Sequence, residues 1–216
     1  MTKIKIAVAG CLGRMGQELS KKIIANNKLE FVGGFEHKKH KNINKEFNKV
    51  SEIQSSNLIH SNPTPSIKLA NVLIDFTTPQ STLENIKIAS LNKTAVVIGT
   101  TGISSAQKNK IKIFSKKIPI LMSSNMSLAV NLLFNLVKQT SSALKETDYD
   151  IEIAETHHKH KKDAPSGTAL SLGDYAALGR KTSLNKSKIL DRTKKLSSRK
   201  KGDIGFAVTR GGEIAG

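Results

Sequence analysis

The sequence predicts an α/β protein: a doubly wound parallel sheet followed by a smaller α+β domain. Short apolar runs alternate with helical patterns over residues 4–122, which is typical of a parallel sheet covered by helices. A glycine-rich turn follows the first apolar run. After about Asn125 the pattern changes to one long helix and a half-exposed strand. We therefore expect two domains, at residues 1–126 and 127–216.

In the first domain, apolar runs bounded by turn residues predict the strands. They cover Ile4–Ala9, Leu29–Phe35, 72–76, Ala95–Ile98 and 118–122. Leucine, isoleucine and methionine at helical spacing predict a helix over 15–26. Pro79 precedes a second helix, which runs to about Leu91. Ser104 and Gln107 have the spacing of a capping box, so a third helix begins there.

The second domain is expected to begin with a helix over 127–144. Residues 150–154 alternate polar and apolar side chains, as a half-exposed strand does. Ser166 opens a helix that ends near Gly179, and residues 205–210 form a further strand. Between them, residues 181–203 hold seven lysines and two arginines against two aspartates, which predicts a mobile basic loop.

Composition narrows the possible functions. The formal charge is 35 − 17 = +18, which is typical of a nucleic-acid binder, but the lysines are spread along the chain and Trp is absent. We therefore expect no nucleic-acid partner, and a field that favours anionic ligands. The sequence has no apolar run long enough for a membrane span and no secretory signal, and Cys11 is its single cysteine. These features predict a cytoplasmic protein without a disulfide or membrane partner.

The glycine-rich turn resembles a dinucleotide fingerprint. Gly10, Gly13 and Gly16 lie between the first predicted strand and the first predicted helix. Glycines let the backbone approach a pyrophosphate, and the helix start offers free N–H groups. Glu36 ends the second predicted strand, 20 positions after Gly16, where an acidic residue would bind the adenosine ribose. A glycine turn used only for packing is the alternative.

Two features of this region stay open on the sequence alone. Glu36 favours NAD, but residues 37–41 are two histidines and three lysines, which could receive the 2′-phosphate of NADP or form a solvated turn. Cys11 lies inside the glycine turn, where it is either a redox sensor or a tolerated small residue.

The segment from Glu152 to Ala169 carries the candidate chemistry. Residues 157–162 hold three histidines and three lysines, and Ser166 caps the following helix. His157, His160 and a nearby carboxylate could hold a metal, although the lysines would repel a cation. The favoured interpretation is an acid–base site for an anionic substrate. A carboxylate bound at the helix start beside a proton donor suits reduction of a carboxylated C=C or C=N bond.

These motifs together resemble the dihydrodipicolinate reductases, a bacterial and plant family of lysine biosynthesis. The segment 152–169 matches the signature of that family position by position. The glycine loop, Asp75-Phe76-Thr77, Gly99-Thr-Thr-Gly102 and Asn125 with Ser127 occur in the family's order and cover nearly all the chain.

The resemblance implies a Rossmann domain that binds NADH or NADPH. No metal is expected, because the lysines of residues 157–162 would repel a cation. The implied pyrophosphate contacts are Gly10, Cys11, Leu12, Gly13, Arg14 and Met15. Glu36 would bind the ribose, and His37 stands where relatives often have an arginine for the 2′-phosphate. The residues implied to flank the nicotinamide are Gly99, Thr100, Thr101, Ser123, Ser124, Asn125 and Met126.

The resemblance also implies a substrate site and an oligomer. His157 resembles the family's proton donor/acceptor and Lys161 its proton donor. The implied contacts of the substrate carboxylates are His158, Gly167 and Thr168. The implied reaction takes 4-hydroxy-tetrahydrodipicolinate, a small dicarboxylate, or the dihydrodipicolinate formed from it, to tetrahydrodipicolinate in the diaminopimelate pathway. The second domain is implied to build a homotetramer if it is complete.

One departure from the family pattern leaves alternatives open. Family members usually continue past residues 206–210 with further strands and a closing helix, whereas this sequence stops at Gly216. The second domain is therefore expected to be C-terminally incomplete. The alternatives are a non-catalytic dinucleotide-binding remnant, another Rossmann oxidoreductase acting on an amino or keto acid, and a basic nucleic-acid binder.

Overall fold

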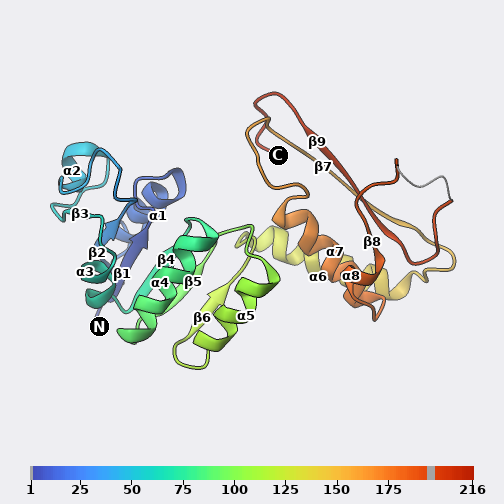
Figure 1. Ribbon diagram of the computed structural model, residues 1–216, viewed down its shortest axis with the longest axis horizontal. Helices are drawn as coiled ribbons and strands as arrows, with labels where there is room; N and C mark the ends of the chain where they lie inside the picture. The colour runs from blue at the N-terminus through green and yellow to red at the C-terminus, as the bar shows by residue number, and fades with distance from the viewer. Residues whose placement is uncertain (1, 194–197) are drawn as a thin grey trace. The chain divides into compact units, whose positions relative to one another are not determined.

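The computed structural model describes residues 2–193 and 198–216 (Figure 1). The chain divides into two compact units, Met1–Ser123 and Ser124–Gly216. Each unit has its own sheet and its own buried core, so each is described by itself. In the described part of the chain, every helix is too short or too polar to cross a membrane.

The first unit is built on a six-stranded parallel sheet with the order β3-β2-β1-β4-β5-β6 (Figure 1). The strands are β1 (Ile4–Ala9), β2 (Leu29–Phe35), β3 (Ile59–His60), β4 (Val72–Asp75), β5 (Ala95–Ile98) and β6 (Ile120–Met122). The chain first adds strands on one side of β1 and then on the other. This reversal creates a switch point between β1 and β4, where doubly wound sheets bind ligands.

Helices cover both faces of this sheet, as the sequence predicted. They are α1 (Arg14–Ile24), α2 (Phe47–Val50), α3 (Thr64–Leu69), α4 (Pro79–Leu91) and α5 (Ser105–Phe114). Successive side chains of a strand point to opposite faces. Accordingly Ile6 and Val8 belong to one buried cluster and Ala7 and Ala9 to the other. The doubly wound arrangement is confirmed.

Local signals predicted some elements closely and missed others. The predicted bounds of β1, β2, β5 and α4 agree with the structure, and the capping box of Ser104 and Gln107 is present at the start of α5. The elements α2, β3 and α3 were not predicted. Each has two to six residues, too few to show a hydrophobic period. Tertiary burial supports them, since Phe47, Ile59 and Ile67 are fully buried.

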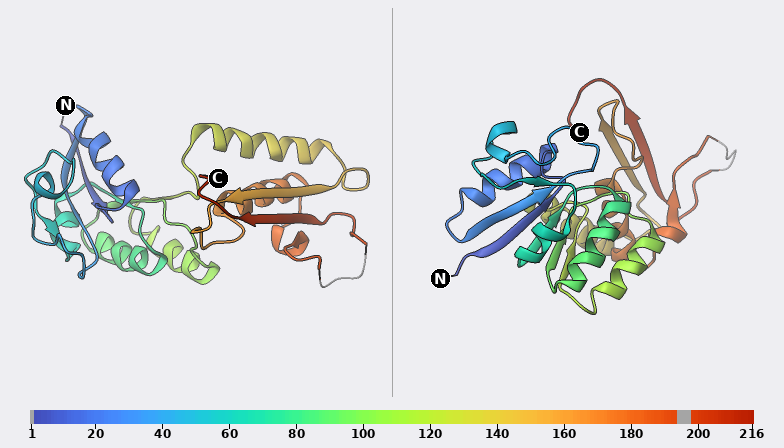
Figure 2. Two further views of the ribbon diagram at one scale, coloured as in Figure 1. Left: turned by 90° about the horizontal axis from the view of Figure 1, so that it is seen from above. Right: turned by 60° about the vertical axis from the view of Figure 1, so that its left-hand side comes forward.

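The second unit has three parallel strands in the order β7-β9-β8. Its elements are α6 (Leu128–Ala143), β7 (Ile151–His157), α7 (Gly167–Gly179), α8 (Leu184–Ser187), β8 (Lys188–Ile189) and β9 (Ile204–Arg210). The left view of Figure 2 shows α6, in yellow, running alongside β7 and β9. The strand predicted at 150–154 extends to His157, which therefore belongs to a strand end rather than to the turn beyond it.

Small residues let α6 and α7 pack closely. The buried side of α7 is formed by Ala169, Gly173, Ala176, Ala177 and Gly179. A Cβ atom added at Gly179 would lie 2.9 Å from the Cβ of Ser141 on α6, closer than a normal van der Waals contact. The rings of Phe134 and Tyr175 stack with centroids 5.2 Å apart and complete the helix contact. Substitutions at Gly179 are therefore limited by space.

The structure revises the prediction that the basic segment 181–203 is a mobile loop. Residues 194–197 lie outside the described residues. The prediction is wrong for residues 184–189, which form α8 and β8 because Leu184 is buried and Ile189 pairs with Gly205 on β9.

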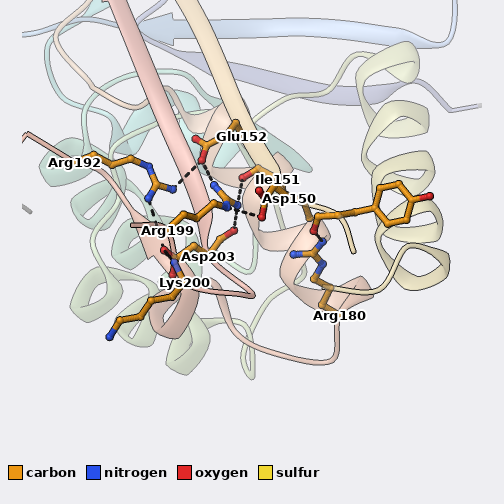
Figure 3. A network of polar contacts seen from close by, with 9 residues as sticks. Asp150, Ile151, Glu152, Arg180, Arg192, Arg199, Lys200 and Asp203 are labelled. Carbon is orange, nitrogen blue, oxygen red and sulfur yellow. Dashed lines mark hydrogen bonds and ion pairs between the residues drawn. The ribbon is translucent and has the colours of Figure 1, made fainter. Parts of the chain in front are cut away.

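Acidic residues at the start of β7 bind the arginines of this segment (Figure 3). Glu152 accepts from Arg192 Nη2 at 2.8 Å and also pairs with Arg199. Arg199 Nε lies 2.6 Å from an oxygen of Asp150, and Arg199 Nη2 donates to the carbonyl of Ile151 at 3.0 Å. Local charge repulsion is therefore offset by ion pairs formed through tertiary structure.

The space around Gly179 generates a stability prediction. Gly→Ala inside a helix normally stabilises by up to about 1 kcal/mol. Gly179→Ala is expected to do the opposite and destabilise by about 1–3 kcal/mol, because the added methyl group overpacks the contact with α6. Thermal or urea unfolding measures the change. Gly211→Ala is the matched control, since among the described residues nothing lies within 4 Å of its added Cβ. Equal effects of the two variants would contradict the packing argument.

Candidate active site

The glycine loop joins the end of β1 to the start of α1. Gly10 has φ +66°, a left-handed conformation that glycine adopts without strain, and its N–H donates to the carbonyl of Phe35 at 2.9 Å. Gly16 is buried against this turn: a Cβ atom there would lie 2.7 Å from Cys11 Cα. Gly10 thus shapes the turn, and Gly16 lets α1 approach it closely.

The first turn of α1 offers backbone donors to a ligand. Gly13 is the N-cap residue and has no side chain that could cap the helix. The first N–H groups of a helix have no intrahelical acceptor, and the helix dipole places partial positive charge there. Arg14 and Met15 are exposed at this end. An anionic pyrophosphate fits this combination of donors and charge.

Glu36 follows β2 and is tied to the glycine loop. Its Oε1 accepts the Leu12 N–H at 2.8 Å, and its Oε2 accepts the His37 N–H at 3.2 Å. The structure therefore brings the predicted ribose-binding carboxylate to the predicted phosphate loop. His37 is exposed, as are Lys38 and Lys39.

Cys11 is fully buried beneath the loop. Burial raises the pKa of its thiol far above the usual range, and the charge of Glu36 raises it further. A thiol that stays protonated is a poor nucleophile. The structure therefore favours a tolerated small residue over a redox sensor.

A buried carboxyl group organises the ends of β4 and β5. Asp75 is fully buried, and its Oδ2 accepts from Asn85 Nδ2 at 2.8 Å. Its Oδ1 accepts the hydroxyl of Thr77 at 2.6 Å and lies 3.3 Å from the Thr100 hydroxyl, which in turn accepts the Thr77 N–H at 2.9 Å. Thr100 is therefore buried and links two loops through its hydrogen bonds. Its neighbours are more accessible to solvent: Gly99 is half-buried and Thr101 is exposed.

The sequence did not identify Asp75 as the centre of this network. Its signal was a single acidic residue closing an apolar strand, followed by Thr77. A charge at the end of a buried strand requires donors, and donors from residues 82, 85 and 100 could be recognised only after folding.

The network predicts a difference between two neighbouring threonines. Thr100→Val removes a hydroxyl that serves both Asp75 and Thr77, so unfolding free energy should fall by about 1–3 kcal/mol. Thr101→Val changes an exposed side chain and should alter stability by less than about 0.5 kcal/mol. Chemical denaturation of both variants tests this. Similar stabilities for the two would show that the Asp75 network does not hold the loops.

The end of β7 and the start of α7 form the second cluster. Glu155 Oε1 accepts the Ser166 N–H at 2.7 Å and a hydrogen bond from Arg210 at 3.0 Å. Glu155 Oε2 lies 3.2 Å from His157 Nδ1, an ion-pair distance. Burial alone would raise the pKa of Glu155, but the bonds from Ser166 and Arg210 lower it below its usual value. This stabilisation is present above the ordinary carboxyl pKa and is lost as pH falls through the lowered one.

Lys161 is held by the same turn. Its Nζ lies 2.8 Å from Asp163 Oδ1, and its side chain is only 20% exposed. Burial would raise the pKa of Asp163, but the hydrogen bond from Lys161 and backbone donors lower it. The Asp163 carbonyl also accepts from Arg210 at 2.6 Å. Lys161 is thus an ordered, half-buried ammonium rather than a freely solvated surface lysine.

The remaining predicted substrate residues lie at the start of α7. Ser166 caps the helix through the Ala169 N–H, which leaves Gly167 and Thr168 in the first turn. The Thr168 hydroxyl accepts from Asn125 Nδ2 at 3.3 Å, and Ser124 lies 2.7 Å from Ser171 between hydroxyl oxygens. His158, the residue after β7, is half-buried, and its carbonyl accepts the Lys161 N–H. The turn therefore combines histidine, lysine and helix-start donors.

The predicted nicotinamide-flanking residues fall into both units. Gly99, Thr100, Thr101 and Ser123 belong to the first, whereas Ser124, Asn125 and Met126 begin the second. Met126 is exposed. Over residues 2–193 and 198–216, no three His, Cys, Asp or Glu side chains are grouped to hold a metal ion.

A six-stranded parallel sheet with a glycine loop at the switch point, joined to a unit with an acid–base segment, defines a Rossmann-type oxidoreductase. The family models "Dihydrodipicolinate reductase, N-terminus" and "Dihydrodipicolinate reductase, C-terminus" match residues 4–126 and 129–216. The chain belongs to the dihydrodipicolinate reductase family, whose reductases use NADH or NADPH.

Curated relatives agree with this assignment. A 4-hydroxy-tetrahydrodipicolinate reductase of Bradyrhizobium sp. (strain ORS 278) is 40% identical to this chain. The alignment covers 100% of this chain and 79% of the relative's length. A second, from Mesorhizobium japonicum, is 41% identical over 98% of this chain and 78% of its own. The structure of a dipicolinate-bound dihydrodipicolinate reductase from Paenisporosarcina sp. TG-14 has a TM-score of 0.66 and 26% identity, over 99% of this chain and 81% of that one. A non-catalytic remnant is not favoured by these matches.

Proposed function

We propose that this chain reduces 4-hydroxy-tetrahydrodipicolinate, or the dihydrodipicolinate formed from it, to tetrahydrodipicolinate, as its curated relatives are named to do. The observation that carries the proposal is the turn from β7 to α7. It unites His157, Lys161 and the first turn of a helix, where Gly167 and Thr168 are half-buried, within 12 residues, 157–168. A dicarboxylate needs fixed positive charge and N–H donors, and its reduction needs a proton source.

The second unit would bind and protonate the substrate. Gly167 and Thr168 present first-turn N–H groups to one carboxylate, and His158 and Lys161 add positive charge beside it. His157 exchanges a proton with the reacting centre, and Lys161 supplies a second proton. The ion pair with Asp163 fixes the direction of the Lys161 ammonium before the substrate binds. This arrangement needs little reorganisation when charge develops on the substrate.

The first unit would bind the cofactor, which supplies the hydride when bound. The residues proposed for the pyrophosphate are Gly10, Cys11, Leu12, Gly13, Arg14 and Met15. Glu36 and His37 would face the adenosine ribose and its 2′ position. Gly99, Thr100 and Thr101, with Ser123, Ser124, Asn125 and Met126, would flank the nicotinamide, and Thr100 would act through its buried bonds to Asp75 and Thr77.

The assembly and cellular location belong to the same proposal. Homotetramer formation through the second unit follows from the family resemblance. A cytoplasmic location fits a biosynthetic reductase with a single, buried cysteine. Mass measurement of the native protein in solution tests the tetramer.

The first kinetic prediction concerns the acid–base residues. His157→Gln and Lys161→Ala should each lower kcat by roughly 10²–10⁴-fold, the usual contribution of general acid–base catalysis. NADH affinity should hardly change, because the proposed cofactor residues 10–15 and 36–37 belong to the other unit. Lys162→Ala is the matched control: the residue is the exposed neighbour of Lys161, and its loss should leave kcat within about twofold. Steady-state assays with freshly generated substrate would refute the roles if the first two variants turned over like the control.

The second kinetic prediction concerns the cofactor. NADH and NADPH should both bind, because Glu36 suits the ribose hydroxyls and the basic residues 37–41 suit a 2′-phosphate. Glu36→Ala should weaken NADH by about tenfold, which is about 1.4 kcal/mol, and shift the preference towards NADPH, because a carboxylate repels a 2′-phosphate.

Fluorescence titration of both nucleotides measures this preference. Glu30→Ala controls for the change in net charge, because Glu30 is an exposed acidic residue on β2, the strand that precedes Glu36. If neither nucleotide binds the folded protein, or if Glu36→Ala leaves the NADH-to-NADPH ratio unchanged, the proposed ribose contact is wrong.

A further inference from the structure

Glu155 is a nearly buried carboxylate inside the proposed substrate-binding unit. Its side chain is 9% exposed, although it lies two residues before His157 at the end of β7. Residues two apart on a strand share one face, so Glu155 and His157 point the same way. A charge so far out of water needs several hydrogen bonds to remain there.

The carboxylate is anchored from two other elements. The Ser166 N–H, at the start of α7, and Arg210, at the end of β9, both donate to Oε1, at 2.7 and 3.0 Å. Arg210 is itself fixed by its bond to the Asp163 carbonyl. Oε1 is occupied by these donors, whereas Oε2 and His157 Nδ1 are both buried without a hydrogen-bond partner. They lie 3.2 Å apart, an ion-pair distance, so each is the polar atom that faces the other.

An acceptor at Nδ1 decides which nitrogen of the ring carries the proton. Neutral imidazole holds one proton, and a carboxylate beside Nδ1 keeps it there as a donor. Nε2 is then the nitrogen with the free lone pair. In the protonated ring, the Nε2–H bond breaks when the proton moves to the substrate, its electron pair stays on Nε2, and Nδ1–H continues to face Glu155.

We infer that Glu155 is a positioning residue that keeps the proton of His157 on Nδ1, so that Nε2 exchanges the catalytic proton. The inference rests on the proposed function for the role of His157, but not for the contact itself. The same carboxylate ties the strand that carries His157 to the helix start that carries Gly167 and Thr168. One group therefore sets the orientation of the acid and anchors the carboxylate cradle beside it.

Glu155→Gln tests the inference with a nearly isosteric change. The Gln amide oxygen can still accept from Ser166 and Arg210, but its NH₂ group would face Nδ1 and favour the tautomer with the proton on Nε2. We expect kcat to fall by roughly 10–100-fold with KM within about twofold, a smaller loss than removal of the histidine itself. The ¹⁵N chemical shifts of the neutral His157 ring, assigned with His157→Gln, should change from the Nδ1–H to the Nε2–H pattern.

Glu152→Gln is the matched control. Glu152 lies on the same strand and binds arginines, as Glu155 does, but it is half-exposed and pairs with Arg192 and Arg199 at the opposite end of β7. Its variant should keep the wild-type kcat and the wild-type His157 spectrum. A purely structural role of Glu155 would reduce the folded fraction while leaving the tautomer and the kcat of the folded enzyme unchanged, and that result overturns the inference.

Two further outcomes separate the inference from the proposed function. If wild-type protein shows no reductase activity, the proposed function fails, while the spectrum of His157 still reports on its contact with Glu155. If Glu155→Gln does not fold, the wild-type spectrum decides: the Nε2–H form contradicts the inference and the Nδ1–H form supports it.

Discussion

The loops of the first unit depend on the burial of Asp75. A carboxyl group taken out of water at the end of β4 must be satisfied by hydrogen bonds, or it would cost several kcal/mol. Thr77 and Thr100 supply donors from the ends of β4 and β5, and Asn85 supplies another from α4. Because these donors come from separate segments, satisfying one group fixes the loops at the carboxyl ends of two strands. Those ends are where doubly wound sheets bind nucleotides.

The second unit uses the same principle with a different carboxylate. Glu155 accepts hydrogen bonds from Ser166 at the start of α7 and from Arg210 at the end of β9. Its second oxygen lies at an ion-pair distance from His157 on its own strand. In both units a poorly solvated acidic group at a strand end joins loops that are distant in sequence. Such networks are demanding, since each member must be satisfied, but once complete they hold side chains in one geometry. A reductase needs that precision at both the cofactor and the proton donor.

Part of the positive charge of the chain is held in ion pairs. Arg192 and Arg199 are bound to Glu152 and Asp150, and Lys161 is paired with Asp163. The lysines and histidines of residues 37–41 follow Glu36 directly after β2. Long-range attraction of an anionic cofactor and a dicarboxylate is favoured by a net charge of +18.

The sequence by itself determined the order of the main elements, the doubly wound class and the candidate residues, because period, glycine turns and caps are local properties. Ile4–Ala9, Pro79–Leu91 and the capping box at Ser104 could be predicted for that reason. Only the tertiary structure decided that the short α2, β3 and α3 form, that residues 184–189 leave the expected basic loop, and that His157 belongs to a strand. The sequence also could not show that Asp75 and Glu155 are the centres of hydrogen-bond networks. Their importance depends on donors up to 55 residues away, and neither propensity nor spacing encodes which distant groups will meet when the chain folds.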